Sequence, residues 1–168
     1  YRVSNIKIFM NRGCPNNDYK KQNRVKYMEI KLIPLRKNDK DMVMIKAMHN
    51  ETSISKYISI SEMYFNYVTN TENVIYYKII VDGRLVGGIH SEVLNDIMDI
   101  SICILPEYQK QGFASFAMRK LIASIPQSIS KIQVSIDETN VASIRLFEHL
   151  GFKKDRQEEE LIGYIYIL

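Results

Sequence analysis

Polar and apolar positions alternate in several stretches of the chain, which predicts strands, and recur every three or four residues in others, which predicts helices. Residues 29–35 alternate in the first way, and Pro34, which has no backbone donor, is expected to end the pairing of that strand. Met42, Ile45 and Met48 follow at helical spacing. A first strand followed by a first helix is therefore expected.

A second helix and a hairpin are expected in the middle of the chain. The apolar positions within residues 53–68 recur at mixed helical spacings and predict one helix. Residues 73–81 and 85–90 are rich in Val, Ile and Tyr, and the Asp82-Gly83 pair between them is typical of a tight turn. The two runs predict antiparallel strands.

Strands alternate with helices in the remainder of the chain. We expect a strand over 97–105 closed by Pro106, a helix over 111–125, a strand over 131–136, a helix over 140–150 and a strand over 161–168, with room for one more short strand near 152–155. The order is β-α-α-β-β-β-α-β-α-β. This order predicts the α/β class, with a mixed sheet and flanking helices in an α/β sandwich.

Length and composition indicate an ordinary folded protein. A chain of 168 residues has room for one domain, and its 46% hydrophobic and 25% charged residues are typical of globular proteins. It contains no run of 18 apolar residues and no signal-peptide pattern at its start. We therefore expect a cytoplasmic protein that does not enter the membrane.

The net charge of +4 is distributed unevenly along the chain. Residues 1–27 carry seven Lys and Arg against one acid, whereas the rest carries 16 bases against 18 acids. We expect residues 1–27 to be a basic leader, either an upstream extension or a cloning-derived segment, and residues 28–168 to be the domain. Because the domain itself is acidic, nucleic acid is not its expected partner.

Cysteine and histidine positions give no sign of a disulfide framework or a metal site. Cys14 lies in the polar leader and Cys103 in an apolar run, so both are expected to be free thiols. The three histidines, His49, His90 and His149, have no metal-ligand spacing. No metal is expected.

The junction between one strand and the next helix points to chemistry. Residues 97–105 form the expected strand, and Gln109–Ala114 open the helix. The first N–H groups of a helix lack partners and its dipole is positive there, so a phosphate group binds readily. Gly112 and Ala114 keep side chains clear, Lys110 adds positive charge, and the glutamines of the turn can donate from their amides. The segment predicts a pyrophosphate site.

Two motifs of this region resemble those of one family. Residues 102–114 read I-C-I-L-P-E-Y-Q-K-Q-G-F-A, a strand and proline followed by the form Gln/Arg-x-x-Gly-x-Gly/Ala. Residues 137–152 read D-E-T-N-V-A-S-I-R-L-F-E-H-L-G-F and approach N-x-x-A-x-x-L-Y-x-x-x-G-F. Both blocks, in this order, are similar to those of the GNAT superfamily of N-acetyltransferases. The resemblance extends over residues 28–168 and implies acetyl-CoA as cosubstrate.

The resemblance also implies roles for individual residues. Backbone groups of the strand would bind the pantetheine and the thioester carbonyl, the following turn would hold the pyrophosphate, and the second block would line the other side of the cosubstrate. The residues implied are Ile102, Cys103, Ile104, Gln109, Lys110, Gln111, Gly112, Phe113, Ala114, Ser115, Asn140, Ser143 and Phe147.

The chain departs from the family at its catalytic positions. Phe147 stands where a tyrosine often protonates the leaving sulfur, so that acid is missing, and Tyr164, Tyr166 or a water would have to substitute. The base that deprotonates the amine is expected to be Asp99, with Glu92 as second candidate, although either can be a solvated acid at a strand end.

Three functions follow as hypotheses. The first is an N-acetyltransferase, a monomer or a homodimer, that transfers the acetyl group of acetyl-CoA to a primary amine of a small molecule or of a protein N-terminus or lysine, by direct attack in a ternary complex. The second, motivated by Phe147, is an acyl-CoA-binding sensor with weak or no turnover. The third is a nucleic-acid-binding module built on the basic leader.

Three further aromatic residues have two expected positions. We expect them to pack in the core or to line an acceptor pocket; they are Tyr57, Tyr64 and Tyr67.

Overall fold

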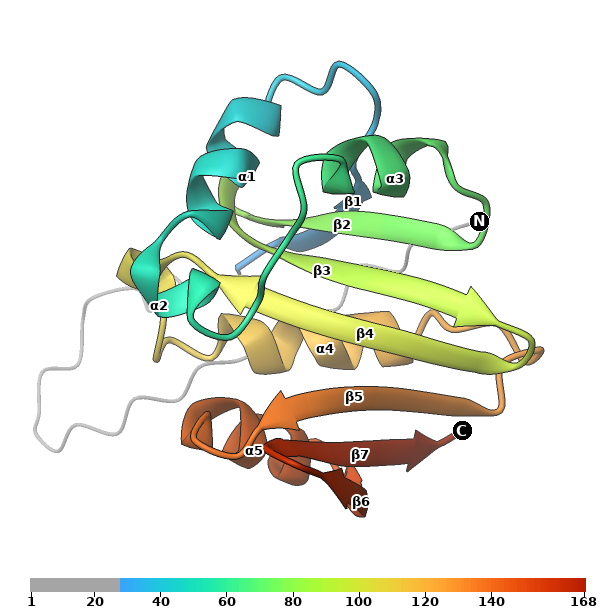
Figure 1. Ribbon diagram of the computed structural model, residues 1–168. Coiled ribbons are helices and arrows are strands. Elements are labelled where there is room, and N and C mark those ends of the chain that lie inside the picture. The colour runs from blue at the N-terminus through green and yellow to red at the C-terminus, as the bar shows by residue number, and fades with distance from the viewer. Residues whose placement is uncertain (1–27) are drawn as a thin grey trace, which may run out of the picture.

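Seven strands form one mixed sheet in the computed structural model, which describes residues 28–168, with the order β1-β2-β3-β4-β5-β7-β6 (Figure 1). Every neighbouring pair is antiparallel except β4 and β5, which are parallel. The strands are β1 (Ile30–Pro34), β2 (Val74–Val81), β3 (Arg84–Leu94), β4 (Ile97–Ile104), β5 (Lys131–Asp137), β6 (Lys153–Glu158) and β7 (Leu161–Ile167).

Helices cover both faces of this sheet. They are α1 (Met42–His49), α2 (Thr52–Ser55), α3 (Tyr64–Asn70), α4 (Phe113–Ile122) and α5 (Val141–His149), and a 3₁₀ turn spans Pro106–Tyr108. Two hydrophobic clusters follow the two faces, one built with residues of α4 and α5 and the other with residues of α1, α2 and α3. Successive residues of β4 point to opposite faces and belong to different clusters, Ile104 to the first and Cys103 to the second. The expected α/β sandwich is confirmed.

The prediction of a single helix over 53–68 was wrong. The structure has α2 and α3 instead, with an irregular segment between them. That segment contains Ile58, Ser59, Ile60 and Ser61, and serine and β-branched residues favour a helix less than straight-chain residues do. The hydrophobic positions had the right spacing, but the polar ones between them do not sustain a helix.

The first strand ends at Pro34, as the missing backbone donor of this residue predicts. Pro34 is in register with Tyr77 of β2, and Leu35 then donates from its backbone N–H to the Tyr76 carbonyl at 2.7 Å. β1 is an edge strand of the sheet, so a residue without a donor can sit there with its nitrogen turned away from the ladder. The short strand near 152–155 is present as β6.

A buried ion pair fixes the connection between β1 and α1. Lys78 of β2 is only 5% exposed, and its Nζ donates to Asp39 at 2.8 Å and to Asp41 at 2.7 Å. Both carboxylates lie immediately before α1. Because the buried lysine is paired with two carboxylates, its charge is not left without a partner, and the start of α1 is anchored over the sheet.

Within 28–168, no helix is both long and apolar enough to cross a bilayer. The predicted basic leader and Cys14 lie outside these residues, whereas Cys103 is described and is a buried free cysteine.

Close packing at one glycine carries a prediction about stability. Tyr76 lies over Gly88, and a Cβ added at Gly88 would stand 2.1 Å from the Tyr76 hydroxyl oxygen. We expect Gly88→Ala to lower the free energy of unfolding by about 2–3 kcal/mol, because the ring cannot move without disturbing a packed core. Gly83→Asn is the control: this glycine has a φ of +80° and open space around its Cβ position, and asparagine tolerates that φ. Urea unfolding of both variants measures the difference, and equal losses would contradict the prediction.

Candidate functional site

The parallel pairing of β4 with β5 is short. It joins Ile97–Asp99 to residues 131–133 and then stops, while β4 stays paired with β3 as far as Ile104 and β5 stays paired with β7 as far as Asp137. Every second residue of a strand directs its N–H and C=O to the same side. Past Asp99, the backbone groups of β4 that face β5 therefore find no partner on that strand and are open to a ligand.

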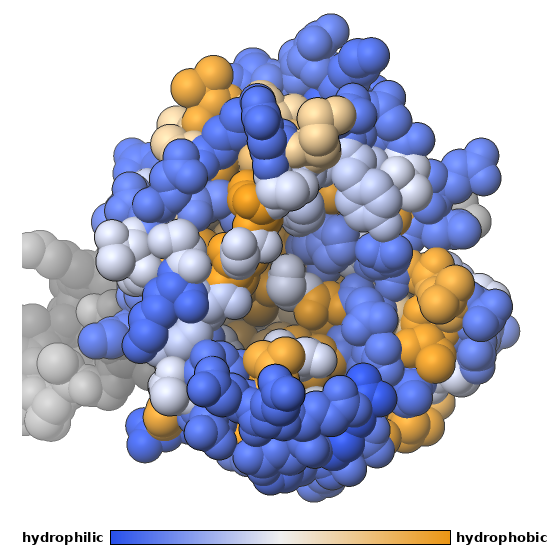
Figure 2. Space-filling view, in the orientation of Figure 1, coloured by the Kyte–Doolittle hydropathy of each residue, from blue (hydrophilic) through white to orange (hydrophobic). Residues whose placement is uncertain are grey.

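A cavity of about 820 Å³ occupies this gap. β4 contributes residues 101–104 to its lining and β5 contributes residues 134–137, and residues 53–58 close it on the side of α2. Ser101 and Cys103 lie on the face of the sheet that α1, α2 and α3 cover, called here the α1–α3 face. Ile102 and Ile104 lie on the face that α4 and α5 cover. The cavity is therefore lined from both faces of the sheet. In Figure 2 the surface is hollowed near the middle of the molecule, with apolar atoms at the base of the hollow.

The N-terminus of α4 forms one end of the cavity. Gly112 is the N-cap residue, with a φ of 85°, and it offers no side chain to the first N–H groups of the helix. Lys110 also has a positive φ, of 58°, and lines the cavity together with Phe113, Ala114 and Ser115. Uncapped N–H groups, the positive end of the helix dipole and a lysine make this a favourable place for an anion.

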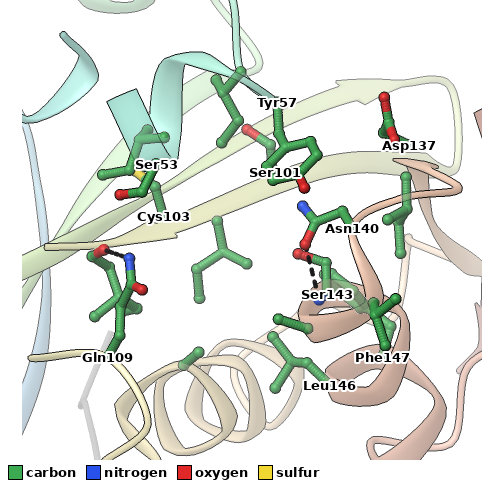
Figure 3. Close-up of a pocket in the computed structure, with 18 of the residues that line it drawn as sticks. Ser53, Tyr57, Ser101, Cys103, Gln109, Asp137, Asn140, Ser143, Leu146 and Phe147 are labelled. Atoms are coloured by element: carbon green, nitrogen blue, oxygen red, sulfur yellow. Dashed lines mark hydrogen bonds between the residues drawn. The ribbon is translucent and has the colours of Figure 1, made fainter. Parts of the chain in front are cut away.

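The two glutamines of this turn are engaged in the turn itself. Gln109 donates from Nε2 to the Ile104 carbonyl at 2.9 Å, as Figure 3 shows, and Gln111 donates to the Glu107 carbonyl at 2.9 Å. Both bonds brace the loop between β4 and α4. Of the thirteen residues expected to bind the cosubstrate, Gln111 alone does not line the cavity.

The start of α5 forms the opposite end. Asn140 caps the helix by accepting the Ser143 N–H at 3.2 Å, and both residues line the cavity (Figure 3). Asp137 accepts two bonds from Thr139, from its N–H at 2.8 Å and its hydroxyl at 2.6 Å, and these bonds lower the pKa of Asp137. A carboxylate held in this way is a weak base, although it is the only acid among the cavity-lining residues.

Phe147 of α5 lines the cavity, but most of its side chain is buried in the hydrophobic core. It is 2% exposed, and its ring stands edge-on to that of Phe152 with the centroids 5.0 Å apart. The substitute acids considered from the sequence lie elsewhere: Tyr164 donates to Glu148 at 3.2 Å, Tyr166 packs on Phe152, and neither lines the cavity. The structure brings no tyrosine of β7 to the site.

The two carboxylates expected to act as bases lie beside the cavity and not in its lining. Asp99 and Glu92 are register partners on β4 and β3. Asp99 accepts from the Gln133 amide at 2.8 Å, and Glu92 accepts from the Tyr67 hydroxyl at 2.8 Å. Their direct role in catalysis stays a prediction.

Sequence reasoning missed His90. Its register partner is Ser101, which lines the cavity, and paired residues on antiparallel strands point to the same face. The Tyr64 hydroxyl lies 3.1 Å from Nδ1 and a Glu92 carboxylate oxygen 3.7 Å from Nε2. Burial lowers the pKa of His90, while Glu92 opposes that change. No spacing along the chain could have revealed these partners, because they depend on strand register.

Sequence reasoning also missed Lys56, and it left the position of Tyr57 open. Both residues line the cavity, and the Lys56 Nζ stands 4.7 Å from the centroid of the Tyr57 ring. The Tyr57 hydroxyl forms hydrogen bonds with Lys56 and Thr139, and these bonds lower the pKa of Tyr57. Figure 3 shows the Tyr57 hydroxyl directed across the cavity toward Asn140. Of the three tyrosines considered for an acceptor pocket, Tyr57 alone lines this cavity.

Comparison with known families gives the site its context. The model of the acetyltransferase (GNAT) family matches residues 43–152, which is more than half of the chain. The chain belongs to this family. The resemblance carried by the two motifs is therefore confirmed, whereas no match was found among the curated proteins.

Solved structures share the GNAT fold. A domain from Methanocaldococcus jannaschii is 25% identical, with 83% of this chain and 99% of that one covered and a TM-score of 0.71. The aminoglycoside acetyltransferase AAC(6′)-Ib in complex with coenzyme A is 16% identical, with 82% and 94% covered and a TM-score of 0.71. Spermidine N-acetyltransferase from Vibrio cholerae, in complex with CoA and spermine, is 18% identical, with 82% and 95% covered and a TM-score of 0.69.

A buried histidine next to the site makes stability depend on pH. His49 of α1 is 3% exposed, its Nε2 lies 3.1 Å from the Tyr76 hydroxyl oxygen, and burial lowers its pKa from 6.5 to about 4. The unfolded chain binds this proton more readily, so the contribution of His49 is complete above pH 6.5 and is lost as the pH falls toward 4, by up to about 3 kcal/mol. Urea unfolding at pH 7 and pH 4.5 should show a smaller loss in His49→Gln than in the wild type. Equal losses would contradict this.

Proposed function

We propose that this chain transfers the acetyl group of acetyl-CoA to a primary amine, carried by a small molecule or by a protein N-terminus or lysine, through direct attack in a ternary complex. The observation that carries the proposal is the cavity in the β4–β5 gap, lined from both faces of the sheet. A donor that enters along one face and an acceptor that enters from the other can meet there without a covalent enzyme intermediate.

The residues present fit acetyl-CoA. The pyrophosphate binds the uncapped N–H groups of α4, with Lys110 supplying positive charge and Gly112 leaving the backbone accessible. The pantetheine arm contains amides, which pair with the open N–H and C=O groups of β4 in the manner of an added strand. The neighbours crystallised with CoA support this assignment.

The acetyl transfer itself needs three things from the protein. A backbone N–H of β4 polarises the thioester carbonyl, a base takes a proton from the amine, and the sulfur leaves as the C–S bond breaks. Phe147 cannot protonate that sulfur, but a thiol with a pKa near 8.5 leaves tolerably well as a thiolate, which then takes a proton from solvent. Turnover is therefore compatible with the missing tyrosine.

An amine acceptor is supported by what the neighbours act on. Two of them are named as acetyltransferases of an aminoglycoside and of spermidine, both of which carry primary amines. Our proposal for this chain stays at that level of chemistry, a primary amine.

The test of this proposal is release of free CoA thiol from acetyl-CoA in the presence of a panel of amines, among them a polyamine, an aminoglycoside and a peptide with a free N-terminus and lysine. We expect amine-dependent thiol release with at least one member, and a product heavier by one acetyl group in the mass spectrum. Binding of acetyl-CoA by calorimetry without release in any case would favour the acyl-CoA sensor instead. Absence of binding would overturn both.

A charge placed at the start of α4 tests the acetyl-CoA site separately. Ser115 lines the cavity in the first turn of this helix. Ser115→Asp should weaken acetyl-CoA binding by about tenfold or more, because the carboxylate occupies the N–H groups and repels the pyrophosphate, while an acid in the first turn leaves the helix stable. Ser115→Asn is the neutral control of the same shape. Calorimetric affinities of the two variants, with their melting temperatures, measure the effect, and equal affinities would refute it.

A further inference from the structure

His90 occupies a defined place on the α1–α3 face of the sheet. It lies in a row across three strands, with Tyr76 of β2 on one side and Ser101 of β4 on the other as register partners. Residues paired in this way stand with their Cβ atoms about 4.5–5.5 Å apart. Ser101 lines the cavity and His90 does not, so the sheet places His90 one side chain away from the point where an acceptor would meet the thioester.

The partners of His90 are a hydroxyl at one ring nitrogen and a carboxylate near the other. The Tyr64 hydroxyl lies 3.1 Å from Nδ1, and a role as base at Nε2 requires the hydrogen on Nδ1, from which the ring then donates to the Tyr64 oxygen. The nearest acid, Glu92, lies 3.7 Å from Nε2, too far for a hydrogen bond to the neutral ring but near enough to stabilise a protonated one. Glu92 is itself held by the Tyr67 hydroxyl at 2.8 Å.

We propose that His90 accepts the proton of the attacking amine, with Tyr64 accepting a hydrogen bond from Nδ1 and Glu92 stabilising the charged form of the ring. This deepens the function proposed above and rests on it. In the step, the amine nitrogen forms a bond to the acetyl carbon, its proton passes to Nε2 of His90 directly or through one water, and the C–S bond breaks. The CoA sulfur takes a proton from solvent, and His90 returns its own proton to solvent. Glu92 and Tyr64 are positioning residues.

The surroundings of His90 suit this role. Burial lowers its pKa, so the ring is neutral and able to accept a proton near pH 7. The titratable groups around it are Tyr64 of α3, Tyr76 of β2, Glu92 of β3, Asp99 of β4 and, at longer range, His49 of α1. Glu92 and Asp99 raise the pKa of His90 against the effect of burial, and His49, which is neutral at this pH, adds no charge.

The experiment compares pH profiles of kcat/KM in variants of the full chain, using an amine that the wild type acetylates. His90→Gln should lower kcat/KM by about 100-fold or more and remove the rising limb that a histidine of lowered pKa gives on the acid side of neutrality, with acetyl-CoA affinity unchanged by calorimetry. Glu92→Gln should cost about tenfold and move the rising limb to lower pH, because the charged ring loses its partner. His149→Gln, at an exposed histidine of α5 outside the cavity lining, is the control and should match the wild type.

The outcomes separate this inference from the proposed function. A wild type that acetylates an amine, with a His90→Gln variant that retains kcat/KM within threefold or keeps the wild-type pH profile, would overturn the role of His90 alone. The same holds if Asp99→Asn abolishes turnover while His90→Gln does not, because a carboxylate would then be the base. A wild type without turnover on any amine would overturn the proposed function and this inference together. Melting temperatures and acetyl-CoA affinity show whether each variant is folded.

Discussion

The early end of the β4–β5 ladder is the constraint on which the rest of the structure depends. Three residue pairs join the strands, and beyond them two rows of backbone groups face a gap. Each unmade sheet hydrogen bond costs about 1 kcal/mol or more when no other partner replaces it. The outer pairings of β4 with β3 and of β5 with β7 continue past this point, so each half of the sheet stays rigid while the gap stays open. The site is therefore a set of backbone N–H and C=O groups that the sheet leaves unpaired and that a ligand can bind.

Side-chain packing on the two faces holds the two halves of the sheet together across the gap between β4 and β5. One hydrophobic cluster contains residues of β4, β5, α4 and α5, among them Ile100, Ile132, Met118 and Phe147, so a continuous core lies on that face of the sheet. On the other face, Lys78 and its two carboxylates anchor the start of α1, and Tyr76 fills the space that Gly88 leaves. The polar groups next to the cavity are thereby fixed by elements far apart in the sequence.

Local sequence signals predicted what is local in this molecule. The strand, turn and helix from Ile97 onward and the second motif before Phe152 are contiguous, and their spacing was enough to predict the cavity walls that the structure contains. Propensity failed between α2 and α3, where serine and isoleucine interrupt the helical pattern. The relation of His90 to Ser101 and Tyr64 could not be predicted, because it depends on antiparallel register and on where α3 packs.

Phe147 places an apolar ring in the α5 wall at the position where a tyrosine hydroxyl would otherwise stand. The ring packs against Phe152 and is 2% exposed, so it offers no proton donor to the cavity. In the proposed reaction the leaving sulfur takes its proton from solvent, whereas the proton of the amine is removed on the other face of the sheet, beside Ser101. The proposed reaction thus uses the two faces of the sheet separately, one for the proton that leaves the amine and the other for the proton that reaches the sulfur.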